Sequence, residues 1–206
     1  VELWYYFTNT SNRRTLVQKY DGNQGYQLAY NSINGTLTGT VIQNNNTVAK
    51  ASFSSTVQQN EWTHVVMSYE ANTGTLYFYV NGVLDKMATG DSSINTSNSE
   101  PLGIGSSGGP ISTSANVIID ELRIWNEVRT PGQIQANKDV ELSGSEANLV
   151  AYYNFNHGIA GGDNASGCPN NIPCVDTLFD LTTNQNNGVL TNFALTGASS
   201  NWVSGA

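Results

Sequence analysis

"EWTHVVMSYEANTGTLYFYVNGVLDK", residues 61–86, predicts three short antiparallel strands joined by two tight turns. Apolar side chains alternate with polar or aromatic ones over Val65–Tyr69 and again over Leu76–Val80. Such alternation is typical of strands with one face on a core and the other on solvent or ligand. After the second strand, Asn81-Gly82 is a residue pair that favours a type I′ hairpin turn. The stretch therefore predicts a meander within a larger antiparallel sheet.

Similar strand signals recur at short intervals and are separated by clusters of Gly, Asn, Ser and Asp, the rhythm of a sandwich or barrel. They are VELWYYF (1–7), GYQLAYN (25–31), GTLTGTVIQ (35–43), NTVAKASF (46–53) and NVIIDELRIW (116–125). One helix is predicted near residues 130–138, because Thr130 can cap it, Pro131 suits its first position and Gln133 completes a capping box. The fold class expected is all-β: a two-sheet antiparallel β-sandwich with one short helix.

The length of 206 residues suits a single β-sandwich domain spanning 1–206. The C-terminal segment 149–206 is too short to build a core alone, so we expect it to complete the same sandwich. A formal net charge of -8 makes nucleic acid and anionic lipid poor partners. No apolar run reaches the ~18 residues of a membrane helix, so membrane insertion is not expected.

Two cysteines, Cys168 and Cys174, flank a short segment that contains two prolines. They predict either a disulfide-closed loop or a metal or redox pair; the disulfide is the simpler interpretation because the spacing is not C-x-x-C and further ligands are missing nearby. A disulfide indicates an oxidising compartment. The chain begins directly in a strand without a visible signal peptide, so we interpret it as a segment of a longer secreted precursor.

Three stretches in a characteristic order resemble the laminin-G-like, concanavalin A-like jelly-roll superfamily: residues 62–82, LGIG at 102–105, and IIDELRIWNEVRTPGQIQAN at 118–137. The order is similar to that of pentraxins. The segments at 149–164 and 180–197 are similar to the ends of laminin-G-type modules in secreted Bacteroidetes proteins. The resemblance implies a jelly roll at the cell surface or outside the cell. Pentraxins bind calcium in an acidic loop, but LGIGSSGGPIS (102–112) has no carboxylate, so that metal site is not transferred.

A structural Ca²⁺ is the cofactor we consider, because the tail is rich in the carboxylate and amide oxygens that calcium prefers. The candidate ligands are Asp163, Asn164, Asp176, Asp180, Asn184 and Asn187, with Asp120 as a further candidate on the apolar side of its strand. The alternative is that these residues form turns and that backbone amides satisfy Asp120.

Glycan binding requires aromatic faces for the C–H surfaces of a sugar and polar groups for its hydroxyls. The outward faces of three predicted strands offer such a platform: Trp4 and Tyr6, Tyr77 and Tyr79, and Trp125 with Glu121 and Arg123. The alternative is that Trp4 and Trp125 pack beneath loops, since large aromatic residues are usually mostly buried.

Catalysis is not predicted. Glycoside hydrolysis needs two carboxylates facing each other across the bond, whereas Asp120 and Glu121 are adjacent on one strand and point to opposite faces. His64 and His157 lack the sequence context of a catalytic nucleophile, so we interpret them as structural.

The function predicted is therefore non-catalytic carbohydrate binding or adhesion, within a larger extracellular or cell-surface protein whose partners are glycans and neighbouring domains. The alternatives are a structural spacer or protein-interaction module without sugar binding, and a glycoside hydrolase or polysaccharide lyase. A cluster of exposed aromatic side chains would favour the first, and a pair of close carboxylates in a groove would favour the last.

Overall fold

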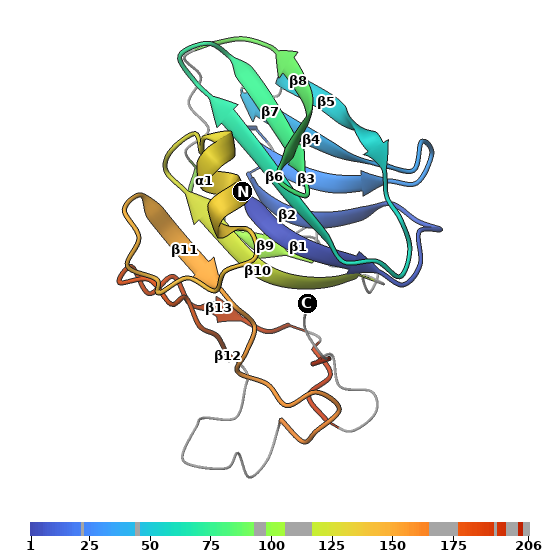
Figure 1. Cartoon of the computed structure of the whole chain (residues 1–206), viewed down its shortest axis with the longest axis vertical. Helices are drawn as coiled ribbons and strands as arrows, with labels where there is room; N and C mark the ends of the chain where they lie inside the picture. The colour runs from blue at the N-terminus through green and yellow to red at the C-terminus, as the bar shows by residue number, and fades with distance from the viewer. Residues whose placement is uncertain are drawn as a thin grey trace. The chain divides into compact units, whose positions relative to one another are not determined.

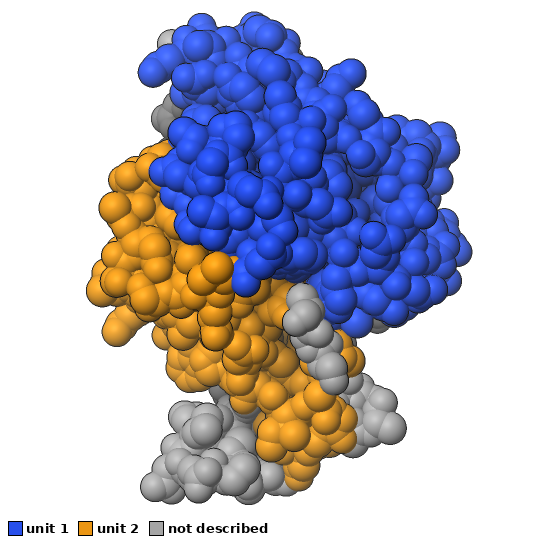
Figure 2. Space-filling model, viewed as in Figure 1, with its two compact units in different colours: residues 1–119, 128–139 blue, residues 120–127, 140–206 orange. Residues whose placement is uncertain are grey.

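The computed structural model describes residues 1–21, 23–43, 46–92, 98–105, 117–164, 177–191, 193–196 and 202–203. The chain divides into two compact units, shown in blue and orange in Figure 2. Unit 1 comprises residues 1–119 and 128–139, and unit 2 comprises residues 120–127 and 140–206. That the whole chain forms a single domain stays a prediction.

Unit 1 contains two antiparallel layers (Figure 1). The first layer has the order β1-β6-β7-β8, with β1 (Glu2–Phe7), β6 (Thr63–Glu70), β7 (Thr75–Val80) and β8 (Val83–Thr89). The second has the order β5-β4-β3-β2-β9, with β5 (Asn46–Thr56), β4 (Thr36–Gln43), β3 (Gly25–Asn31), β2 (Arg14–Tyr20) and β9 (Gly103–Ile104). The predicted all-β, two-sheet antiparallel sandwich is confirmed.

The core of unit 1 lies between these layers because the inward residues of each strand are apolar. Phe7 of β1 contacts Tyr30 of β3 with ring centroids 5.0 Å apart, and Phe53 of β5 contacts Phe78 of β7 at 4.4 Å. Gly39 of β4 faces this core so closely that an added Cβ would lie 2.3 Å from the Phe78 ring. The two layers are therefore held together by interdigitated aromatic side chains.

The meander of β6, β7 and β8 confirms the prediction from residues 61–86. Its turn residues Asn81 and Gly82 have φ of 49° and 80°, as a type I′ turn requires. At the edge, the Asp85 carboxylate on β8 accepts hydrogen bonds from the backbone amides of Ser54 and Ser55 on β5, at 2.5 and 2.9 Å. This clip joins the edge strands of the two layers.

The predicted helix is α1 (Pro131–Asn137), the one helix in the part of the chain that the structure describes. Thr130 and Gln133 form the expected capping box. Ile134 is fully buried against Val66 of β6 and Tyr79 of β7. The helix thus covers the outer face of the first layer (Figure 1). Within the described residues, no helix has the length and apolarity needed to cross a membrane.

Unit 2 contains most of β10 (Val117–Trp125), which begins in unit 1, and three further strands: β11 (Leu149–Tyr153), β12 (Thr177–Leu178) and β13 (Gly188–Val189). β10 pairs with β11, and β12 pairs with β13, each antiparallel. The turn 180–187 is anchored by the Asp180 carboxylate, described below. The predicted disulfide of Cys168 and Cys174 lies outside the described residues.

Candidate binding site

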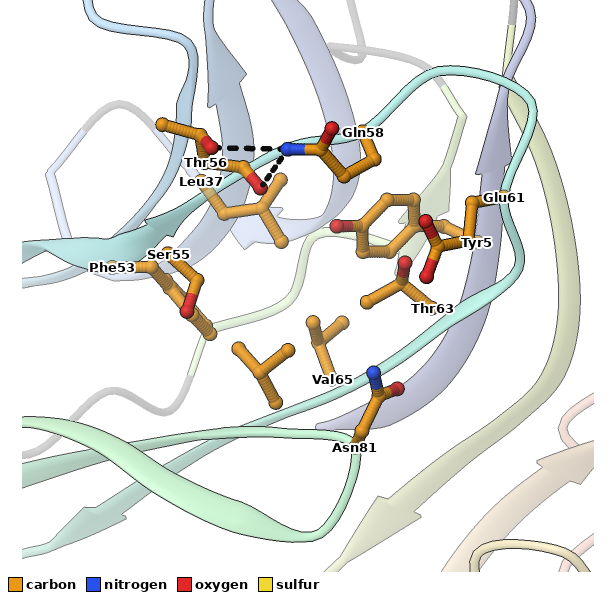
Figure 3. A pocket seen from close by; sticks show the side chains of 11 residues that line it. Tyr5, Leu37, Phe53, Ser55, Thr56, Gln58, Glu61, Thr63, Val65 and Asn81 are labelled. Atoms are coloured by element: carbon orange, nitrogen blue, oxygen red, sulfur yellow. Dashed lines mark hydrogen bonds between the residues drawn. The ribbon is translucent and has the colours of Figure 1, made fainter.

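A small hollow opens at the rim of the unit 1 sandwich, between the two layers (Figure 3). Its accessible volume is about 90 Å³. The apolar part of the lining, which we call the floor, consists of Leu37, Phe53, Val65 and Val80. The polar part of the lining, which we call the rim, consists of Tyr5, Ser55, Thr56, Gln58, Glu61, Thr63 and Asn81. Apolar side chains and hydrogen-bonding groups thus lie together in this hollow, and small-ligand sites combine the same two kinds of group.

Strand register brings these residues together. Tyr5 and Thr63 are directly opposite each other on β1 and β6, and Glu61 lies two residues before Thr63 in the connection that enters β6. Figure 3 shows Tyr5, Glu61 and Thr63 side by side at one side of the hollow. Opposite them, Ser55 and Thr56 come from the end of β5 in the other layer. The hollow therefore exists only because the two layers meet.

Tyr5 is the most buried residue of the rim, at 3% exposed. Burial raises the pKa of Tyr5 to about 12, a hydrogen bond from Thr63 lowers it, and the Glu61 charge raises it. Tyr5 therefore stays protonated near neutral pH and can donate a hydrogen bond to a ligand oxygen.

Three other rim residues offer polar groups. The Gln58 side-chain amide donates to the carbonyl and hydroxyl oxygens of Thr56 at 3.4 and 3.1 Å, and Asn81 Oδ1 accepts from the His64 amide at 3.0 Å. Gln58 Oε1, Asn81 Nδ2 and the Glu61 carboxylate have no hydrogen-bond partner among the described residues. Both donors and acceptors are thus available at the rim.

The aromatic platform predicted in unit 1 lies on the outer face that α1 covers. Trp4 donates from Nε1 to the Lys138 carbonyl at 2.8 Å, beside the end of the helix. Tyr79 is 4% exposed beneath Ile134. Much of this face is therefore a packing surface for α1.

The other two aromatic residues of this face are half-buried. Tyr6 packs against Trp62 with the rings tilted and their centroids 5.6 Å apart. Tyr77 donates to the Glu70 carboxylate at 3.1 Å. Their role in ligand binding stays a prediction.

The three remaining platform residues belong to unit 2. Arg123 is 1% exposed and donates to Glu121 at 2.7 Å and to the Val140 carbonyl at 2.6 Å. Tyr152 donates to the same Glu121 carboxylate at 2.8 Å. Burial raises the pKa of Glu121, while the hydrogen bonds from Arg123 and Tyr152 oppose this shift. Trp125 is half-buried at the end of β10. Glu121 and Arg123 thus form an internal cluster.

Several candidate calcium ligands of the tail make hydrogen bonds to the backbone. Asp180 is 6% exposed. Its Oδ1 accepts from the amides of Tyr152 and Thr182 at 3.0 and 2.9 Å, and its Oδ2 accepts from the Thr182 hydroxyl and the Asn186 amide at 2.9 and 2.8 Å. Asn187 accepts from the Asp180 amide at 2.9 Å. These bonds fix the turn 180–187 on β11.

The remaining candidates are distributed widely. Asn184 donates to the Val150 carbonyl at 2.9 Å, Asn164 accepts from the Ile159 amide at 2.6 Å, and Asp120 accepts from the Glu121 amide at 2.9 Å. Asp163 is exposed, and Asp176 lies outside the described residues. Within the described ranges, no three His, Cys, Asp or Glu side chains form a group that could hold a metal ion. Calcium binding stays a prediction.

Sequence reasoning did not find the hollow. Tyr5, Phe53 and Val65 face inward on their strands and have the pattern of core residues. Gln58 and Glu61 lie in a connection without a motif. The available signal was the position of Glu61 next to the start of the meander, which places a carboxylate at the rim of the sheet.

Comparison with known proteins gives the family and the fold. The family model for the concanavalin A-like lectin/glucanase superfamily matches residues 1–135. A solved "putative carbohydrate binding protein" from Bacteroides ovatus superposes with a TM-score of 0.66 at 21% identity, over 91% of this chain and 50% of the other. The chain therefore spans half the length of that protein.

Two further structures align less well. A heptameric SAP-like pentraxin from Limulus polyphemus has a TM-score of 0.49 at 17% identity, over 65% of this chain and 66% of the other. The CBM40 of the Ruminococcus gnavus IT-sialidase has a TM-score of 0.49 at 10% identity, over 66% of this chain and 79% of the other. No curated protein sequence matches the chain.

Proposed function

The chain belongs to the concanavalin A-like lectin/glucanase superfamily, and on this premise we propose that it is a non-catalytic carbohydrate-binding module with its site at the hollow of unit 1. The observation that carries the proposal is the composition of the hollow, with an apolar floor below a rim of hydroxyl, amide and carboxylate groups. A sugar has the matching character, because apolar C–H surfaces alternate with hydroxyl groups.

The volume of the hollow limits how a sugar can bind. About 90 Å³ is smaller than the ~150 Å³ apolar cavity that holds one benzene ring. This space suits one substituent of a sugar and is too small for a whole ring. The ring would therefore rest on the rim, within reach of Tyr5, Gln58 and Asn81.

The arrangement supports binding without catalysis. Hydrolysis of a glycosidic bond needs two carboxyl groups ~5–9.5 Å apart across the bond. Among the described residues that line the hollow, Glu61 is the only one with a carboxyl group. The lining of the hollow therefore offers one acidic group and not the two that either hydrolytic mechanism requires.

The proposal also covers the parent protein and its compartment. We place the module in a larger extracellular or cell-surface protein that attaches to glycans, and the two cysteines in the sequence support an oxidising compartment. The proposal includes a structural calcium ion. Glycan binding measured with Ca²⁺ and again with EDTA tests this part of the proposal.

A protein-interaction module is the second candidate, and the exposure of β8 favours it. Val83, Leu84 and Met87 of this strand are 68%, 45% and 51% exposed. β8 is the last strand of its layer within unit 1. Exposed apolar side chains on an edge strand are a feature of protein-binding surfaces.

The test is binding to a panel of algal, plant and host glycans, measured with Ca²⁺ and again with EDTA. We expect at least one glycan class to bind. Thr56→Arg, which fills the mouth of the hollow, should abolish this binding, whereas Ile33→Arg, at a residue 94% exposed outside the hollow, should not. Folded protein that binds no glycan in either condition would refute the proposal and favour the protein-interaction module.

A further inference from the structure

The floor of the hollow is apolar and mostly buried. Leu37, Phe53 and Val65 are 1%, 3% and 0% exposed, and Val80 completes the floor. A hydroxyl group pushed against these side chains would lose its water without gaining a hydrogen bond, which is unfavourable. A methyl group would lose no hydrogen bond and would gain contact with Val80 and with the accessible edges of Leu37 and Phe53, since Val65 is fully buried. The floor therefore selects the substituent that enters.

The rim adds a charge preference. Glu61 contributes a carboxylate, and the described residues of the lining include no Lys, Arg or His. An anionic substituent would approach a like charge and would find no cation to pair with. The formal net charge of the chain, -8, acts in the same direction. The hollow therefore disfavours carboxylated and sulfated sugars.

We propose that the hollow recognises a methyl group carried by an uncharged sugar, and that it rejects acidic sugars through Glu61. This inference rests on the proposed carbohydrate-binding function. Two sugar classes carry such a group: 6-deoxyhexoses, through the methyl at C5, and N-acetylhexosamines, through the acetamido methyl. The shared chemistry is a methyl group that points away from a ring whose hydroxyls reach the polar rim.

Available rim groups fit the rest of such a ligand. The Tyr5 hydroxyl can donate to a ring or amide oxygen, and the Asn81 amide nitrogen can do the same. The Glu61 carboxylate can accept from a hydroxyl or an amide N–H. A ligand that places its methyl on the floor thus finds both donors and acceptors at the level of its polar atoms.

The experiment compares matched monosaccharides by ligand-observed NMR titration of the whole chain. The pairs are L-fucose with L-galactose, and N-acetylglucosamine with glucose, which differ at the methyl-bearing position; glucuronate tests the charge. We expect the methyl-bearing member of at least one pair to bind at least about tenfold more tightly, as expected for one apolar group in an apolar pocket. The pair that shows the preference identifies the source of the methyl group.

Two variants test the assigned roles. Val80→Thr keeps the shape of the side chain but adds a hydroxyl to the floor, and it should reduce the methyl preference to about threefold or less. Glu61→Gln removes the charge and should increase glucuronate binding relative to glucose binding at least about fivefold. Unfolding temperatures of both variants, compared with the parent chain, separate these effects from loss of structure.

Different failures have different meanings. If the glycan panel and the monosaccharides bind without any methyl preference, the inference is overturned and the proposed function stands. If glucuronate binds the parent chain as well as glucose does, the charge assignment is overturned. If nothing binds to folded protein, the proposed function fails together with the inference.

Discussion

The turn 180–187 of unit 2 and the hollow of unit 1 use polar side chains in opposite ways. Asp180 turns its carboxylate inward, and both oxygens accept two hydrogen bonds each from the chain itself. At the hollow, Glu61 and part of Gln58 and Asn81 have no hydrogen-bond partner among the described residues. A polar group that the fold has already satisfied stabilises structure, whereas one left at an accessible rim is available to a ligand.

The largest effect should come from Asp180→Ala, because three backbone amides lose their acceptor. Leaving buried donors unsatisfied costs ~1–3 kcal/mol each, and partial access of water limits the loss here to about 3 kcal/mol. Guanidinium unfolding followed by tryptophan fluorescence measures it. Thr183→Ala, an exposed neighbour in the same turn, should change stability by less than about 0.5 kcal/mol. Equal effects of the two variants would contradict the structural role of Asp180.

Asp85→Ala tests a carboxylate that combines both uses. Asp85 accepts hydrogen bonds from the chain itself, as Asp180 does, and it also supports the lining of the hollow. It holds Ser54 and Ser55 at the end of β5, and Ser55 lines the hollow. We expect a loss of about 1 kcal/mol in stability, since the site is partly exposed, together with weaker sugar binding. Lys86→Ala, at an exposed residue of the same strand, is the matched control. Unchanged binding in Asp85→Ala would show that the clip does not shape the hollow.

Tyr5→Phe tests the rim directly. The variant keeps the buried ring and removes the hydroxyl, so we expect about fivefold weaker sugar binding, equivalent to ~1 kcal/mol for one hydrogen bond. Stability should fall by no more than about 1 kcal/mol, because the ring remains in place and only the hydrogen bond with Thr63 is lost. Calorimetric titration measures the binding, with Tyr20→Phe, outside the hollow, as the control. A parent-like affinity would remove Tyr5 from the proposed site.

The smallest effect concerns pH and unit 2. His157 packs against Phe179 with the rings tilted and their centroids 5.0 Å apart, and burial lowers the pKa of His157 below the ordinary value of 6.5. The unfolded chain therefore binds the proton more readily, so stability should fall as pH drops below about 6.5. His157→Gln should reduce this pH dependence between pH 7 and 5. An identical pH profile in the variant would assign the dependence to other groups.

Local sequence predicted the elements whose causes are local. The alternation over Val65–Tyr69 and Leu76–Val80 indicated strands, Asn81-Gly82 indicated the hairpin, and Thr130 with Gln133 indicated the start of α1. Each of these elements depends on residues a few positions apart, so a short stretch of sequence contains the whole pattern that predicts it. The resemblance to the superfamily depends on the order of these same elements.

The candidate sites were harder to predict, because the fate of a polar or aromatic side chain depends on what packs over it. Tyr79 alternates outward on β7, as expected, but α1 covers it. Asp180 belongs to a tail rich in acids and amides, but its oxygens are directed to backbone amides of residues 152, 182 and 186. No local sequence pattern predicts that α1 covers Tyr79 or that these backbone amides bind Asp180.

By itself, the sequence determined the strands, the turns, the capped helix and an acidic surface, because propensity, periodicity and charge act between near neighbours. Only the tertiary structure decided which residues form the hollow. Tyr5, Phe53 and Glu61 come from separate parts of the chain and meet where two layers close on each other. Sheet register and packing between layers are long-range properties, so a binding site built from them becomes visible only in the folded chain.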